Sequence, residues 1–171
     1  MVNVDITNDL DLSFVQNKNL RFTLDTGEPD FHVKNIGVNW MSNQMIDSIL
    51  QVGEGAFMLS AVKIHKPFLV LFIPDLNRVD FLKIGSKLAS HALLTTLMDI
   101  VFVHVQSRDK ASIVLYDSYN HKLGFDLNAI AAALSVGVVT HRLNNKAVFS
   151  YEGCNLKAAW RDYDNHILVS R

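Results

Sequence analysis

The sequence has little of what marks several large classes of protein. Of its 171 residues one is cysteine and three are proline, and 16 basic residues are balanced by 17 acidic ones. A single cysteine excludes an internal disulfide and a cysteine-based zinc site. The balanced charge gives no electrostatic pull toward a phosphate backbone or an anionic lipid surface. We therefore expect neither nucleic acid nor a membrane as a partner.

Long apolar runs are also missing from the chain. No stretch approaches the roughly 20 apolar residues of a membrane-spanning helix, and acids near the N-terminus stand where a secretory signal would need an apolar run. We expect a soluble, cytoplasmic protein, with export as an effector by a signal-independent machine left open.

Signatures of cofactor and metal binding are absent as well. Gly53 and Gly55 precede a predicted strand and lack the following Lys-Ser or Lys-Thr of a phosphate-binding loop. The seven histidines show no pair at the short spacing of metal ligands on one helical turn. We expect no cofactor and no metal site.

What the chain does contain is a high hydrophobic content, 49%, arranged around a predicted hairpin at residues 100–117. Two runs, IVFVHV and ASIVLYD, are rich in β-branched residues and flank the polar turn QSRDK. Because both runs are apolar on both faces, the two strands should lie in the middle of a sheet that is covered on both sides.

Elements on either side of this hairpin complete a predicted α/β (α+β) fold, in which helices pack on the faces of a mixed central sheet. Residues 1–171 should form a single domain, with 1–30 as an extended or edge-strand N-terminal arm. Strands are expected at residues 56–62, 68–73, 138–143, 147–151 and 166–169. Helices are expected from Ser42 to Gly53, from Asn77 to Leu97, from Asp126 to Gly137, and from Asn155 to Trp160.

The lone cysteine, Cys154, stands at the start of the last predicted helix. Backbone amides and the positive end of the helix dipole would favour the thiolate form there. An inert, buried cysteine is the alternative interpretation.

Four short motifs occur in a suggestive order: WMSN from Trp40, FIP at residues 72–74, a hairpin that ends in Tyr116-Asp117-Ser118, and Glu152-Gly153-Cys154. In this order the chain resembles the SUMO-protease, adenovirus-protease and bacterial effector acetyltransferase group. The resemblance implies a thiol hydrolase or acyltransferase with Cys154 as nucleophile, Asp117 as the orienting acid and His91 or another histidine as base.

The catalytic set of that group is incomplete in this chain, because the place of its histidine falls on residues 98–100. Our leading interpretation is therefore a non-enzymatic protein-interaction domain, such as an assembly factor, an adaptor or a catalytically degenerate effector, that binds another protein or a second copy of itself. The thiol enzyme is the alternative. A third possibility is a metal-dependent hydrolase that uses Asp75, Asp80, Asp99 and Asp117 at strand ends.

Overall fold

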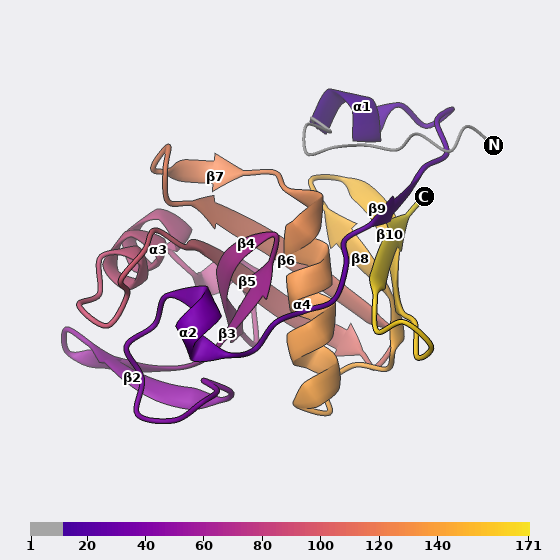
Figure 1. The fold of residues 1–171 in the computed structure, drawn as a ribbon. Coiled ribbons are helices and arrows are strands. Elements are labelled where there is room, and N and C mark those ends of the chain that lie inside the picture. Colours follow the sequence, from indigo (N-terminus) through magenta and orange to yellow (C-terminus); the bar gives the residue numbers. More distant parts are fainter. Residues whose placement is uncertain (1–11) are drawn as a thin grey trace.

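A large mixed sheet organises the chain in the computed structural model, which describes residues 12–171 (Figure 1). The strands are β1 (Thr23–Asp25), β2 (Ser48–Val52), β3 (Gly55–Ile64), β4 (Lys66–Phe72), β5 (Asp99–Ser107), β6 (Lys110–Asp117), β7 (Lys122–Gly124), β8 (Lys146–Tyr151), β9 (Cys154–Trp160) and β10 (Ile167–Ser170). Their spatial order is β1-β10-β9-β8-β6-β5-β4-β3-β2, and β7 pairs with β6 beside this path. The expected α/β class with a mixed sheet is confirmed.

The predicted hairpin lies at the centre of this order. β5 and β6 are antiparallel, with Val103 opposite Ile113, while β5 runs parallel to β4 and β6 runs parallel to β8. Val101, Phe102 and Val103 are fully buried, as strands with cover on both faces require.

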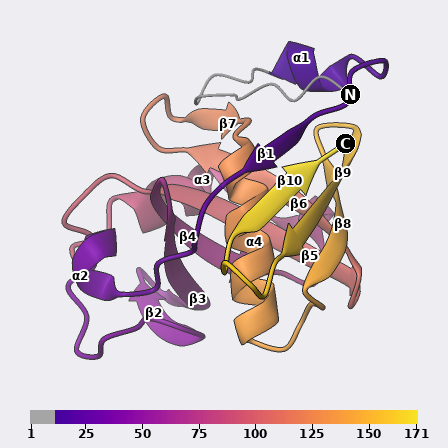
Figure 2. The same cartoon turned by 45° about the vertical axis from the view of Figure 1, so that its right-hand side comes forward.

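One long helix, α4 (Leu127–Val139), covers one face of the sheet. It contacts strands from both halves, β3 to β6 and β8 to β10, so the sheet curves around it (Figures 1 and 2). Asp126 caps the helix as expected, because its carboxylate accepts a hydrogen bond from the Asn128 amide at 2.9 Å. Residues 127–137 of α4 are almost all buried, which suits a helix that is apolar around most of its circumference.

Smaller helices cover the opposite face. These are α2 (Val33–Ile36) and α3 (Phe81–Ala89), with the 3₁₀ turn η1 (Leu76–Arg78) before α3. They enclose a second core in which Phe102 and Tyr116, from the central hairpin, lie against Leu88 of α3. The remaining helix, α1 (Leu12–Gln16), lies near the β9 end of the sheet and buries Val15 in the core that surrounds α4 (Figure 1).

Two helix predictions were wrong because strands form in their place. The segment from Ser42 to Gly53 contains bends followed by β2, in which the burial of Leu50 and Val52 alternates with exposed residues. The segment from Asn155 to Trp160 belongs to β9, where burial also alternates along the strand. β2 is held in the extended form by pairing with β3, and β9 by pairing with β8 and β10. The spacing of apolar residues over so short a segment does not reveal this pairing.

Two boundaries were also wrong. The strand expected at residues 138–143 does not form, because α4 continues to Val139 and a turn then brings Leu143 against Gly137. The helix expected to extend from Asn77 to Leu97 is limited to α3, which begins after the cap Asp80 and ends at Ser90.

The N-terminal arm is described only in part. Of the arm expected at residues 1–30, residues 1–11 lie outside the described residues. Further along, β1 is the edge strand of the sheet and pairs with β10. Within residues 12–171, no helix has both the length and the apolar character needed to cross a membrane.

Candidate functional site

Charged side chains gather where several strands begin or end beside the N-terminus of α4. Lys66 and Asp99 are the first residues of the parallel strands β4 and β5, and Asp117 is the last residue of β6, which runs antiparallel to β5. Tyr151 ends β8, which runs parallel to β6, so it reaches the same edge of the sheet. Together with the α4 cap Asp126, these five residues form what we call the strand-end rim.

Lys66 is the cation of the rim and binds two carboxylates. Its Nζ lies 2.7 Å from Asp99 Oδ2 and 2.8 Å from Asp126 Oδ2. Partial burial opposes the charge of Lys66, but the two carboxylates outweigh this effect and raise its pKa above the ordinary lysine value. Lys66 is therefore a fixed ammonium group at neutral pH rather than a base.

Asp99 and Asp117 are held by the chain around Ser118. Asp99 accepts a hydrogen bond from the Ser118 amide at 2.9 Å, and the Ser118 hydroxyl donates to the carbonyl of Met98. Burial alone would raise the pKa of Asp117, but hydrogen bonds from Asn120 and Tyr119 and the charge of Lys66 lower it. Asp117 is thus a carboxylate at neutral pH, and it remains partly exposed.

Tyr151 joins the rim to α4. Its hydroxyl accepts a hydrogen bond from the Asp126 amide at 3.0 Å and donates to the carbonyl of Gly124 at 3.1 Å. Its ring stacks on Phe125 with centroids 4.6 Å apart. Because burial raises the pKa of Tyr151 far above its ordinary value, the hydroxyl stays protonated and positions the start of the helix.

The rim as a whole presents three carboxylates and one ammonium group. Lys66 already pairs with Asp99 and Asp126, so a small molecule that carries both amino and carboxylate groups can bind through the partly exposed Asp117 and the remaining N–H of Lys66. The rim residues were singled out only in part by the sequence. Lys66, Asp126 and Tyr151 could have been assigned to the same site as Asp99 and Asp117 only by knowing which strands run parallel.

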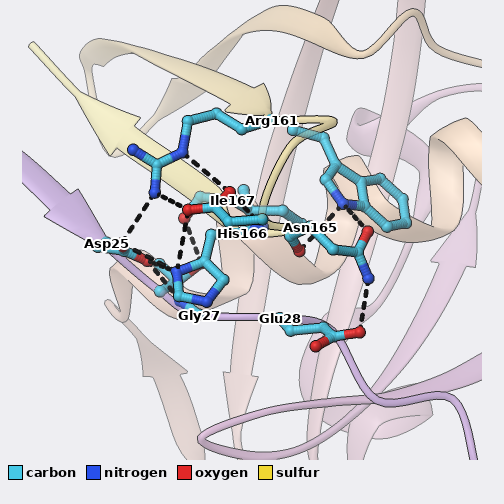
Figure 3. Close-up of polar contacts among 10 residues, drawn as sticks. Asp25, Gly27, Glu28, Arg161, Asn165, His166 and Ile167 are labelled. Atoms are coloured by element: carbon cyan, nitrogen blue, oxygen red, sulfur yellow. Dashed lines mark hydrogen bonds and ion pairs between the residues drawn. The ribbon is translucent and has the colours of Figure 1, made fainter.

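A second polar cluster lies at the edge of the sheet, in β1 and the turn between β9 and β10 (Figure 3). His166 Nδ1 lies 2.9 Å from Asp25 Oδ1, and Arg161 binds both Asp25, at 3.2 Å, and Asp164. The hydrogen bond with Asp25 is the main cause that raises the pKa of His166. Hydrogen bonds and the Arg161 charge outweigh partial burial and lower the pKa of Asp25 and Asp164.

This edge cluster also contains a possible ligand set for a metal ion. One ligand atom from each of Asp25, Asp164 and His166 lies within 4.8 Å of the other two. The guanidinium of Arg161 pairs with both carboxylates, and His166 pairs with Asp25, so the ion-pair network accounts for the geometry without a metal.

The three residues predicted to act together as a thiol site make contacts with three separate parts of the chain. Cys154 is 4% exposed at the start of β9, where its Sγ lies 3.9 Å from the Val15 carbonyl oxygen of α1. His91 follows α3 and lies 3.1 Å from the carbonyl oxygen of Gln51. Asp117 stands at the rim. No helix begins at Cys154, so the expected dipole that would favour its thiolate is absent.

The four acids considered as metal ligands have other partners. Asp75 caps η1, Asp80 caps α3, and Asp117 holds the turn at residues 118–120. Asp99 pairs with Lys66. Of these four acids, only Asp99 and Asp117 lie at the rim.

Comparison with known proteins gives a consistent set of relatives. No protein-family model matches the chain. It is 26% identical over 156 residues to a diaminopimelate epimerase of Rhodopseudomonas palustris, a match that covers 87% of this chain and 52% of the relative. Similar matches are the diaminopimelate epimerases of Desulfitobacterium hafniense, at 24% identity over 94% of this chain and 56% of the relative, and of Moorella thermoacetica, at 21% over 86% and 53%.

These relatives overturn four expectations. The chain spans about half the length of the curated relatives it matches, and they are named as epimerases rather than as members of the SUMO-protease, adenovirus-protease and acetyltransferase group. That resemblance was wrong, since it depended on motifs of two to four residues. The interpretation as a non-enzymatic adaptor or effector is corrected with it, as are the thiol and metal-dependent hydrolases, because the relatives are named as enzymes of a different kind. The expected partner, another protein or a second copy, stays a prediction.

Proposed function

We propose that this chain is an isomerase of the epimerase kind, which inverts a carbon centre in an amino acid that carries more than one charged group. The observation that carries the proposal is the similarity to diaminopimelate epimerases over 86% to 94% of the chain. The proposed substrate class is diaminopimelate and related amino acids.

The chemistry of such a reaction sets what a site must provide. To invert a carbon centre next to a carboxylate, a base must take the proton from one face of the carbon, and an acid must deliver a proton to the opposite face. The substrate must be held in one orientation throughout, because a rotated substrate would present the wrong bond. Opposite charges at fixed positions are the direct means of holding an amino acid.

The strand-end rim supports the proposal by its charges. Lys66 is held protonated and can bind a substrate carboxylate, while the partly exposed Asp117 is held ionised and can bind an ammonium group. The rim stands on strand ends and a helix start rather than on a free loop, so its charges are positioned by the core of the protein.

A hydrogen-exchange experiment tests this proposal. The chain would be incubated in D₂O with one stereoisomer of diaminopimelate, and NMR would follow the loss of the α-proton while chiral chromatography follows the other stereoisomer. We expect both changes with the natural chain. Asp117→Asn should slow them by about tenfold or more, as expected when a charge-assisted contact of about 1.5–3 kcal/mol is lost.

Asp117→Asn is chosen because it removes the charge and keeps the amide oxygen that can hold the turn at residues 118–120. Asp75→Asn is the matched control, since Asp75 loses the same charge at the cap of η1, outside the rim. A folded natural chain that exchanges no α-proton of diaminopimelate would disprove the proposal. Equal slowing by both variants would show that the rim is not the site.

A further inference from the structure

A pocket of about 430 Å³ opens at one corner of the sheet, where β1 begins and β10 ends. Figure 2 shows β1, β10 and β9 side by side in this region. The pocket is lined by Arg21, Phe22, Thr23, Lys157, Ser170 and Arg171. It shares no residue with the strand-end rim.

The strand register brings three of these residues into one row. Thr23 pairs with Ser170, and Ser170 pairs with Lys157, across three adjacent strands. Along each strand, the residues next to these three point toward the core, so Thr23, Lys157 and Ser170 all lie on the outer face of the sheet. Phe22, which is 2% exposed, anchors the segment before β1 in the core.

Positive charge dominates the pocket. Three of its lining residues have cationic side chains, and none of the lining residues within 12–171 has an acidic one. In this described part of the chain, Arg21, Lys157 and Arg171 form no ion pair. Arg171 Nη1 donates to the carbonyl of Asn17 at 2.9 Å, which fixes one edge of its guanidinium and leaves the other N–H groups without a partner.

We propose that this pocket binds a small oxyanion that carries at least two negative charges, either a phosphoryl group or a dicarboxylate. Three cations that line one pocket repel one another, and a bound dianion offsets this repulsion. The Thr23 and Ser170 hydroxyls make no hydrogen bond with the described chain and can donate to oxygens of the same ligand. The volume accommodates more than a bare ion, so the charged group can belong to a larger small molecule.

Isothermal titration calorimetry on the full chain tests the proposal, with inorganic phosphate and succinate as the probes and acetate at matched ionic strength as the singly charged comparison. We expect phosphate, succinate or both to bind with a dissociation constant of about 1 mM or below, and acetate to bind at least about tenfold more weakly. Tighter binding of phosphate would identify a phosphoryl ligand, and tighter binding of succinate would identify a dicarboxylate.

Variants connect the binding to this pocket. Lys157→Gln and Arg21→Gln should each weaken dianion binding by about tenfold or more, since each removes a charge-assisted contact. Lys146→Gln is the matched control, because it removes the same charge from an exposed lysine of β8 that does not line the pocket. The proposal fails if neither dianion binds the folded chain, or if Lys146→Gln weakens binding as much as Lys157→Gln does. It does not depend on the proposed isomerase activity and is read out separately.

Discussion

At the scale of single residues, two valines of the central hairpin differ in their surroundings. Val103 of β5 is fully buried, whereas Val114 of β6 is only partly buried on the face that α3 covers. A carboxylate at position 103 would have neither water nor a partner. We expect Val103→Asp to lower the free energy of unfolding by more than about 4 kcal/mol, and Val114→Asp by about 1–2 kcal/mol. Urea denaturation followed by circular dichroism measures both.

A soluble Val103→Asp protein that unfolds at the same urea concentration as the natural chain would contradict this prediction. Val103→Ala serves as the control, since it removes apolar volume without adding charge.

His166 makes a second residue-scale prediction, on pH dependence. Asp25 raises the pKa of His166 in the folded state above the ordinary 6.5, so folding favours the protonated imidazole. The stability that this pair contributes is fully present below the ordinary pKa and is lost as the pH rises through the raised folded value. We therefore expect the natural chain to lose stability across this window relative to His166→Gln, as measured by urea denaturation at several pH values.

An NMR titration of His166 gives the folded pKa directly. Asp25→Asn should return it toward the ordinary value. A His166 pKa at or below 6.5 in the natural chain would contradict the assignment of the ion pair.

At the scale of elements, α3 depends on a glycine where it meets the sheet. A Cβ added to Gly85 would overlap the ring of Tyr116, a fully buried residue of β6. Alanine is favoured over glycine in a helix by about 1 kcal/mol, but overpacking a core costs about 1–3 kcal/mol. We expect Gly85→Ala to destabilise the protein in thermal unfolding, and Ser86→Ala, at an exposed site one residue later, to leave stability unchanged or slightly raised. A stabilised Gly85→Ala protein would show that α3 does not pack this closely.

At the scale of the whole molecule, the two cores share the strands between them. β4 and β5 supply Val70 and Val103 to the core around α4, and Leu71 and Phe102 to the core beneath α3. If one core unfolded, β4 and β5 would be displaced and the other core would be disrupted too. We therefore expect one cooperative unfolding transition. The two tryptophans report on the two cores separately, since Trp40 packs against one and Trp160 against the other.

Single-tryptophan proteins, Trp40→Phe and Trp160→Phe, test this cooperativity by fluorescence during urea denaturation. Within each protein, the fluorescence midpoint should coincide with the midpoint from circular dichroism. Separate midpoints for the two probes would show that the cores unfold independently.

The sequence by itself determined the elements whose signals are local. The hairpin at residues 100–117 followed from apolar runs on either side of a polar turn, and α4 followed from its cap Asp126 and its apolar spacing. The fold class came from the same signals, because helices interleaved with buried strands must cover a mixed sheet.

Tertiary structure decided the rest. Residues 154–160 and 48–52 are strands because they pair with β8 and with β3, the strands next to them in the sequence, although the apolar spacing within each segment also fits a short helix. The strand-end rim depends on the parallel pairing of β4 with β5 and of β6 with β8, which brings Lys66 to Asp99 across 33 positions of the chain. Parallel pairing leaves no local sequence signal, since the partners are joined by long crossovers rather than by a turn. For this reason Asp99 and Asp117 could be recognised as strand-end acids from the sequence, while the cation between the carboxylates could not.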